Sequence, residues 1–244
     1  MPTCGLPRCY TRISLSGAPG RLMFRYCMIP ILAVLLPAAA AAQTPQRPPA
    51  IETARALQDR YDRVRDFTAS FTHTYQGGVL KKTLSEGGTV EVKKPGRMRW
   101  EYSLPEKKLF VSDGRKIYSY VPADKQVIVS SVPADDQATT GVLFLAGKGN
   151  VTRDFTVSYA KGGSDDTWAL RLDPKSSQRD YDWLILVVDR RSLQIRELTA
   201  ADQQGGTSTF RFMNFRENTG LPDTRFTFRI PRGVDVIDAD SPGR

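Results

Sequence analysis

Histidine and cysteine, on which most metal sites and many catalytic centres depend, are scarce in this sequence. His73 is the only histidine, and the three cysteines, Cys4, Cys9 and Cys27, all precede residue 28. The motifs Gly-x-Ser-x-Gly and His-Glu-x-x-His are absent, as is a phosphate-binding glycine loop. His73 takes an alternating position in a predicted strand, so we interpret it as a structural imidazole. We therefore expect a protein that is not an enzyme, with no catalytic residue, metal site or cofactor.

Large apolar residues gather instead on one face of a predicted strand. Met98, Trp100 and Tyr102 alternate with charged side chains, which directs all three to the same face. Neighbouring predicted strands add further candidates for this face, namely Val90, Val92, Phe110, Tyr118 and Tyr120. The set has two interpretations: an ordinary core beneath helices, or the wall of a cavity that binds an apolar ligand. The pattern alone does not separate them.

The elements that would position these residues are short strands with few helices. Residues 51–67 place apolar side chains at near-helical spacing, which predicts an amphipathic helix. From residue 67 the period becomes two, and about ten short strands follow at hairpin spacing, with Asp113-Gly114 as a turn signal. The last predicted strand covers residues 226–230. We predict a mainly β, α+β domain built as one antiparallel meander.

Residues 138–147 break the alternation because they are apolar on nearly every face. A helix of this kind must be buried on all sides or must cover an apolar surface. With the helix at 51–67, it would lie across the concave face of a curved sheet. Val142, Leu143 and Leu145 therefore join the candidate ligand-binding residues.

Residues 1–42 have the features of a targeting segment. Four arginines and no acidic residue are followed by an apolar run from Met28 and an alanine-rich end at Ala42. We interpret this segment as a cleaved secretory signal peptide, with Met23 as a second possible start. Because all cysteines lie within it, we expect an exported, soluble protein without thiols, in which a Pro-rich linker (43–50) precedes a single domain (51–240).

The charge of the chain argues against a dedicated nucleic-acid binder. The formal net charge is +9, and the four arginines of residues 1–42 account for four of these charges. The remaining excess of five positive charges is moderate for a chain of this length. We therefore expect no nucleic-acid partner.

Several segments match the motifs of one known family. They are Phe67-Thr-Ala-Ser-Phe71, Val92-Lys-Lys-Pro-Gly-Arg-Met-Arg-Trp-Glu-Tyr102, Val111-Ser-Asp-Gly114, Leu143-Phe-Leu-Ala-Gly147 and Phe226-Thr-Phe-Arg-Ile-Pro-Arg-Gly-Val-Asp-Val-Ile237. In this order they resemble the LolA family of periplasmic outer-membrane lipoprotein carriers. The resemblance extends over about residues 51 to 238, and the block around the tryptophan is its most specific part.

The resemblance implies a half-open antiparallel β-barrel with a helical lid over an apolar cavity for lipoprotein acyl chains. It implies a periplasmic monomer whose partners are cargo lipoproteins, an inner-membrane Lol ABC transporter complex and an outer-membrane acceptor, LolB. It also implies a lid latch at Lys94, where the family commonly has arginine. Lysine keeps the charge but lacks the planar guanidinium that bonds several carbonyls at once.

Two other functions fit the same fold. One is an envelope sensor of the RseB type; such proteins usually carry a further C-terminal domain, and this sequence ends at Arg244. The other is a carrier of different exported lipids. LolB itself would need a lipidated cysteine after the signal peptide, and none follows Cys27.

Overall fold

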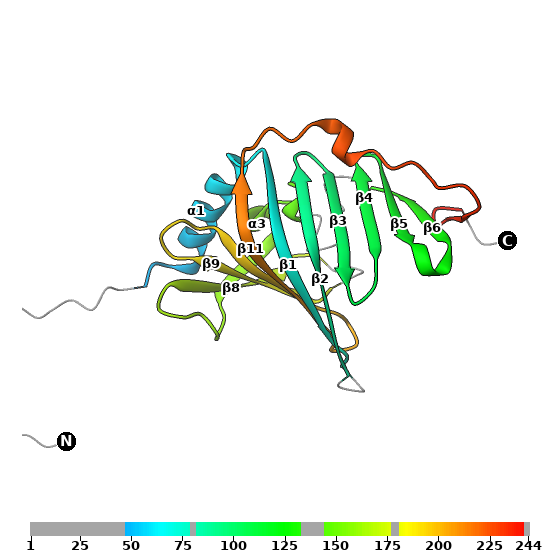
Figure 1. The fold of residues 1–244 in the computed structure, drawn as a ribbon. Coiled ribbons are helices and arrows are strands. Elements are labelled where there is room, and N and C mark those ends of the chain that lie inside the picture. Colours follow the sequence, from blue (N-terminus) through cyan, green and yellow to red (C-terminus); the bar gives the residue numbers. More distant parts are fainter. Residues whose placement is uncertain (1–46, 79–81, 133–143, 177–180, 242–244) are drawn as a thin grey trace, which may run out of the picture. The chain divides into compact units, whose positions relative to one another are not determined.

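A single large sheet forms most of the protein. The computed structural model describes residues 47–78, 82–132, 144–176 and 181–241, so the predicted signal peptide, Val142 and Leu143 lie outside the described residues. The sheet has twelve strands in the order β12-β6-β5-β4-β3-β2-β1-β11-β10-β9-β8-β7, and β8 and β9 run at a steep angle to β2–β5 (Figure 1). It is not closed, because β12 and β7 remain as edges.

The described helices and strands have the following bounds, each group given in chain order. The helices are α1 (Ala50–Asp62), α3 (Val151–Asp154) and the 3-10 turns η1 (Pro122–Asp124) and η3 (Asp223–Phe226). The strands are β1 (Asp66–Gln76), β2 (Thr83–Lys93), β3 (Arg97–Leu104), β4 (Lys108–Asp113), β5 (Lys116–Val121), β6 (Gln126–Ser131), β7 (Phe155–Tyr159), β8 (Thr167–Pro174), β9 (Trp183–Asp189), β10 (Ile195–Ala201), β11 (Thr207–Glu217) and β12 (Asp235–Asp238).

The predicted mainly β, half-open α+β architecture is confirmed, but the sheet is not one meander. Strands β1–β6 form one antiparallel meander and β7–β11 form a second. The two meet where β1 pairs with β11, with Phe71 opposite Phe212. β12 then adds to the edge at β6 in the parallel direction. The local hairpin signals in the sequence do not specify this long-range pairing.

Helix α1 packs its apolar stripe against the sheet. Ala54, Leu57 and Tyr61 are buried, as the near-helical spacing predicts. The helix ends before its predicted end at residue 67, because β1 already begins at Asp66. The Asp66 carboxylate accepts the backbone N–H groups of Thr219 and Gly220, so a tertiary contact fixes where the strand starts.

The predicted strand at residues 226–230 is wrong. Residues 218–234, here called the C-terminal strap, contain the turn η3 and run as coil until β12. Pro222 and Pro231 flank the predicted segment and lack the N–H that a sheet ladder needs. Ion pairs hold the strap instead: Asp223 pairs with Lys93 at 2.6 Å, and Arg225 pairs with Glu91 at 2.6 Å.

Candidate functional site

The predicted apolar residues of β2 and β3 do share one face, here called the inner face. Val92 pairs with Met98 and Val90 pairs with Trp100, and directly opposed residues project to the same side of a sheet. Val90, Val92, Met98, Trp100 and Tyr102 are all buried, at 0%, 1%, 6%, 3% and 9% exposure. Strand alternation, paired in this register, therefore builds a continuous apolar wall.

Phe110 extends this wall onto β4. It pairs with Trp100, and its ring centroid lies 5.6 Å from that of Tyr102 in an edge-to-face arrangement. Its side chain is only half-buried. The wall thus becomes more open towards β4 and β5.

Three phenylalanines that the sequence analysis did not select complete the inner face. Phe71 of β1 contacts Trp100 with ring centroids 4.9 Å apart, and Phe210 of β11 contacts Trp100 at 5.2 Å. Phe212 lies on the same side, opposite Phe71. The alternation within residues 207–215 indicates that Phe210 and Phe212 share one face of their strand. Their proximity to Trp100 depends on the pairing of β1 with β11, which the sequence pattern does not specify.

Trp100 has a feature that a normal core avoids. Its indole N–H is buried without a hydrogen-bond partner, and among the described residues it is the only such side-chain atom. An unpaired buried donor costs about 1–3 kcal/mol. The inner face therefore offers an unused hydrogen-bond donor within an apolar surface.

Residues 144–150, which begin with the described end of the predicted lid segment (144–147), cover part of the inner face near α1. Leu145 is buried, and its carbonyl oxygen accepts the Tyr61 hydroxyl at 2.6 Å. Phe144 stacks on the Tyr61 ring with centroids 5.6 Å apart. The Ala146 carbonyl also accepts the Gly96 N–H at 2.8 Å. This cover is therefore held to both α1 and the turn between β2 and β3.

Lys94 lies where α1, this turn and the cover meet. Its ammonium group donates to the carbonyl oxygen of Tyr61 and lies 3.4 Å from the centroid of the Tyr61 ring. Burial lowers the pKa of Lys94 to about 8, although Asp62 and Glu217 partly oppose the shift. The carbonyls at a helix C-terminus attract such a cation. Lys94 thus bonds α1 directly, while its aliphatic stem lies so close to the cover that a Cβ added at Gly147 would be 2.8 Å from it.

Tyr118 and Tyr120 are placed on the opposite face from Trp100, which contradicts the predicted position of both. Tyr120 pairs with Leu109, the residue before Phe110. Phe110 pairs with Ser119, whereas Tyr118 pairs with Val111. Since neighbouring residues in a strand point to opposite sides, Tyr118 belongs to the outer face. There its ring lies 5.4 Å from that of Phe228 in the C-terminal strap.

A polar cluster ends the inner face where β1, β2 and β11 meet. His73 contacts Glu86 through Nδ1 at 3.2 Å and Ser208 through Nε2 at 2.7 Å. Its ring stacks on Phe210 with centroids 4.2 Å apart. Burial lowers the pKa of His73, although Glu86 opposes this, and Glu86 also pairs with Lys108. The interpretation of His73 as a structural residue agrees with these contacts.

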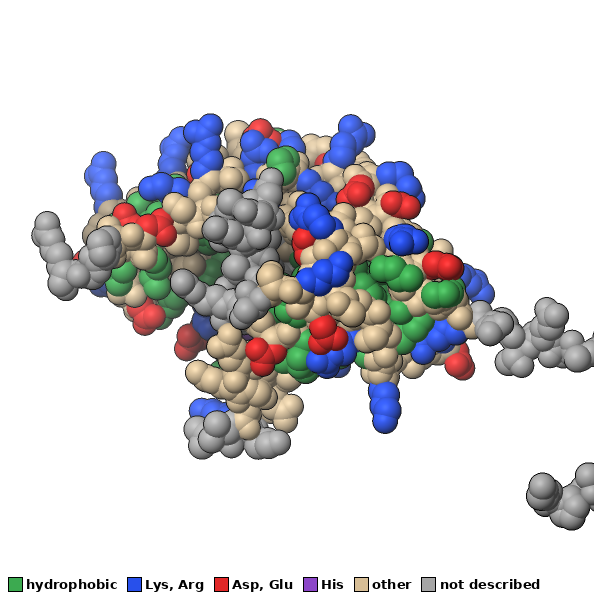
Figure 2. Space-filling view, turned by 180° about the vertical axis from the view of Figure 1, so that it is seen from behind, with side chains coloured by type: hydrophobic (Ala, Val, Ile, Leu, Met, Phe, Trp, Pro, Cys, Tyr) green, Lys and Arg blue, Asp and Glu red, His purple; other side chains and the backbone are tan. Residues whose placement is uncertain are grey.

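The side of the molecule that faces away from the viewer in Figure 1 is not uniformly polar. Figure 2 shows hydrophobic side chains exposed on this side, with Lys and Arg side chains along its upper edge. No helix in the described part of the chain is long and apolar enough to cross a membrane.

The curved open sheet, with an apolar inner face beneath α1 and residues 144–150, defines an α+β half-barrel with an apolar interior. The model of one family, described as outer membrane lipoprotein carrier protein LolA, matches residues 62–229, and the chain belongs to this family. Members of this family are carriers, not enzymes. We therefore interpret the Ser208, His73 and Glu86 contacts as structural rather than catalytic.

Two sequence relatives agree with this assignment. An outer-membrane lipoprotein carrier protein of Pseudomonas paraeruginosa is 27% identical over 72% of this chain and 83% of its own length. One of Chromohalobacter salexigens is 29% identical over 88% of this chain and 97% of its own length. A crystal structure of a LolA superfamily protein from Nitrosomonas europaea aligns over 72% of this chain and 97% of that chain, at 15% identity and a TM-score of 0.40.

Proposed function

We propose that this protein carries lipoproteins through the periplasm by shielding their acyl chains on the inner face. Val90, Val92, Met98, Trp100, Tyr102 and Phe110 would contact the chains, together with Val142, Leu143 and Leu145 of the lid segment. The single observation that carries the proposal is the continuous apolar inner face with one unused donor, the Trp100 N–H. Acyl chains need apolar surface, and an ester carbonyl would accept that N–H.

The energetics favour a carrier with a displaceable cover. Each buried methylene contributes about 0.8 kcal/mol, so an exposed long acyl chain costs roughly 10 kcal/mol in water. The side chains of the inner face are already buried against one another and against the cover. Loading would therefore exchange protein–protein contacts for protein–acyl contacts. This exchange lowers the net affinity and permits release.

The proposed route begins with export, directed by a signal peptide at residues 1–42. An inner-membrane Lol ABC transporter complex would load the carrier, and an outer-membrane acceptor such as LolB would receive the cargo. Lys94 would act as the latch of the cover, because it bonds Tyr61 and its stem lies close to Gly147. Apolar contacts are not directional, so the carrier would accept lipoproteins of different sequence.

Met98→Glu tests the inner face directly. A carboxylate buried there without a partner is unfavourable, so we expect a synthetic triacylated lipopeptide to bind at least tenfold more weakly, measured by native mass spectrometry. Met213→Glu is the matched control, because the same substitution is made at a methionine that is 48% exposed. Circular dichroism would establish that both variants fold. Wild-type loading of Met98→Glu would contradict the proposal.

Photo-crosslinking provides a second readout that does not depend on a disruptive charge. A benzoylphenylalanine at position 100 should capture the acyl chains of lipoproteins in cells, whereas the same probe at position 213 should not. Capture of a free lipid instead of a triacylated protein would indicate a carrier of other lipids. Equal labelling at both positions would remove the support for the inner face as the binding surface.

A further inference from the structure

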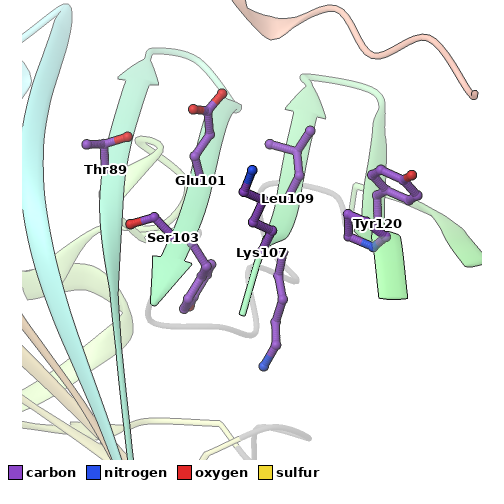
Figure 3. A pocket seen from close by; sticks show the side chains of 9 residues that line it. Thr89, Glu101, Ser103, Lys107, Leu109 and Tyr120 are labelled. Carbon is purple, nitrogen blue, oxygen red and sulfur yellow. The ribbon is translucent and has the colours of Figure 1, made fainter. Parts of the chain in front are cut away.

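The outer face of the sheet holds a groove that the proposed acyl-chain site does not use. Thr89 pairs with Glu101, Glu101 with Leu109, and Leu109 with Tyr120, so these four form one row across β2–β5. The row lies on the face opposite Trp100. Figure 3 shows Thr89, Glu101 and Leu109 side by side on neighbouring strands.

Two hollows meet on this row. The first, about 410 Å³, is lined by the row together with Ser103, Lys107 and Pro122, and at the end of the sheet also by Tyr102 and Lys108 of the inner face. The second, about 470 Å³, lies between the sheet and the C-terminal strap and is lined by residues that include Arg99, Phe228 and Arg229. Leu109 lines both hollows, so they adjoin at this residue, and we call the two together the outer groove.

The C-terminal strap leaves this groove open while it covers the adjacent surface. Its Phe226 is buried, and its Phe228 ring lies 5.8 Å from that of Tyr120. Ion pairs to β2 fix the start of the strap, as described above. The apolar floor formed by Leu109, Tyr120 and Phe228 thus remains half-buried and accessible.

The charges around this floor are not balanced. Arg99 is paired with Glu101 at 2.5 Å, and Lys108 is paired with Glu86. Lys107 and Arg229 are exposed, and neither forms an ion pair with another described residue. Lys107 lines the first hollow, and Arg229 lines the second. A ligand that complements both must be long, with an apolar middle and acidic groups towards its ends.

We propose that the outer groove docks an extended acidic peptide segment of a partner protein. The two cations belong to separate hollows, so they do not converge on one small anion as in a compact ligand site. Successive side chains of an extended peptide alternate in direction, which would let apolar residues reach Leu109 while carboxylates reach Lys107 and Arg229. This docking is distinct from acyl-chain binding, because its floor of Leu109, Tyr120 and Phe228 lies on the opposite face of the sheet; the two sites share only Tyr102 among the residues that line the first hollow.

The probe for this proposal is a fluorescein-labelled synthetic peptide with glutamates at both ends and leucine and phenylalanine between them. Fluorescence anisotropy should detect its binding to the full-length protein. The double variant Lys107→Glu/Arg229→Glu should weaken binding at least tenfold. The matched control is Lys161→Glu/Arg191→Glu, which makes the same charge change at exposed cations outside the groove and should leave binding within about twofold of the wild type.

Three results would overturn the proposal. Equal loss in both double variants would mean that net charge alone attracts the peptide. Equal binding of a peptide with serines in place of the apolar residues would exclude the apolar floor. Binding of phosphatidylglycerol vesicles, lost in the groove variant and without any peptide binding, would identify a membrane-facing surface instead. Lipopeptide loading, measured in the same variants, should not change, so failure here leaves the proposed carrier function standing.

Discussion

At the scale of single residues, Lys94 stands where the family commonly has arginine, and this difference changes how the charge at the contact depends on pH. Its ammonium group is partly desolvated between α1 and the cover, and that burial lowers its pKa to about 8. An arginine in its place would keep its charge at any pH where the protein is folded. The lysine therefore makes this junction sensitive to alkaline pH.

Lys94→Arg should remove one component of the pH dependence of stability. Between pH 8 and the ordinary lysine pKa of 10.5, the unfolded chain binds a proton at Lys94 that the folded protein has lost. The contribution of Lys94 to the free energy of unfolding therefore rises as pH increases through this window. Urea unfolding at several pH values should show the wild type gaining stability relative to Lys94→Arg from pH 8 to 10.5. A constant difference would contradict the desolvated state of Lys94.

At the scale of elements, the cover is held by close packing at Gly147. This residue has φ +80°, and a Cβ added there would lie 2.8 Å from the Lys94 side chain. Left-handed backbone costs a non-glycine residue about 1–2 kcal/mol. At this position the steric contact with Lys94 adds to that cost, so glycine permits the cover to lie against the turn between β2 and β3.

Gly147→Ala should therefore destabilise the protein more than Gly220→Ala. Gly220 has nearly the same φ, +75°, but a Cβ there would meet no atom within 4 Å. We expect about 1–2 kcal/mol for Gly220→Ala from backbone strain alone, and about 1–3 kcal/mol more for Gly147→Ala from overpacking. Chemical denaturation measures both changes. Equal losses would show that Lys94 yields freely and that the cover does not depend on this contact.

At the scale of the whole molecule, the inner face is occupied by the protein's own side chains in this structure. Residues of α1, both meanders and the cover belong to one buried cluster. A ligand can enter only if some of these contacts open, and the cover depends on fewer elements than the strands do. In the proposed function, the two meanders would supply a stable frame and the cover would supply the change on loading.

Hydrogen exchange should locate that change. Loading with a triacylated lipopeptide should speed exchange of the Gly96 and Gly147 amides, which bond Ala146 and Phe144 in this structure. Amides of β8–β10 should not change, because the proposed loading would leave this frame in place. Slower exchange at Gly96 and Gly147 in the loaded protein would mean that the ligand enters without displacing the cover.

The sequence by itself determined the apolar wall and the lack of catalytic chemistry. Alternation in β2 and β3 specified that Val90, Val92, Met98, Trp100 and Tyr102 share faces within their strands, because the side-chain period of a strand is two. It also contained the information that corrects Tyr118. A hairpin with a two-residue turn at positions 114 and 115 pairs Phe110 with Ser119. Paired residues share a face and neighbours along a strand do not, so Tyr118 must lie on the face opposite Phe110.

Only the tertiary structure decided which distant segments meet. Residues far apart in the chain meet at four places. These are the pairing of β1 with β11, the contacts of the C-terminal strap, the bond from Lys94 to α1 and the outer groove. Local propensity and periodicity specify which side of a strand is apolar, but they do not specify which strand it pairs with when that strand is not its neighbour in the sequence. Long-range pairing is selected by the burial of whole faces against each other, and that burial exists only in the folded chain.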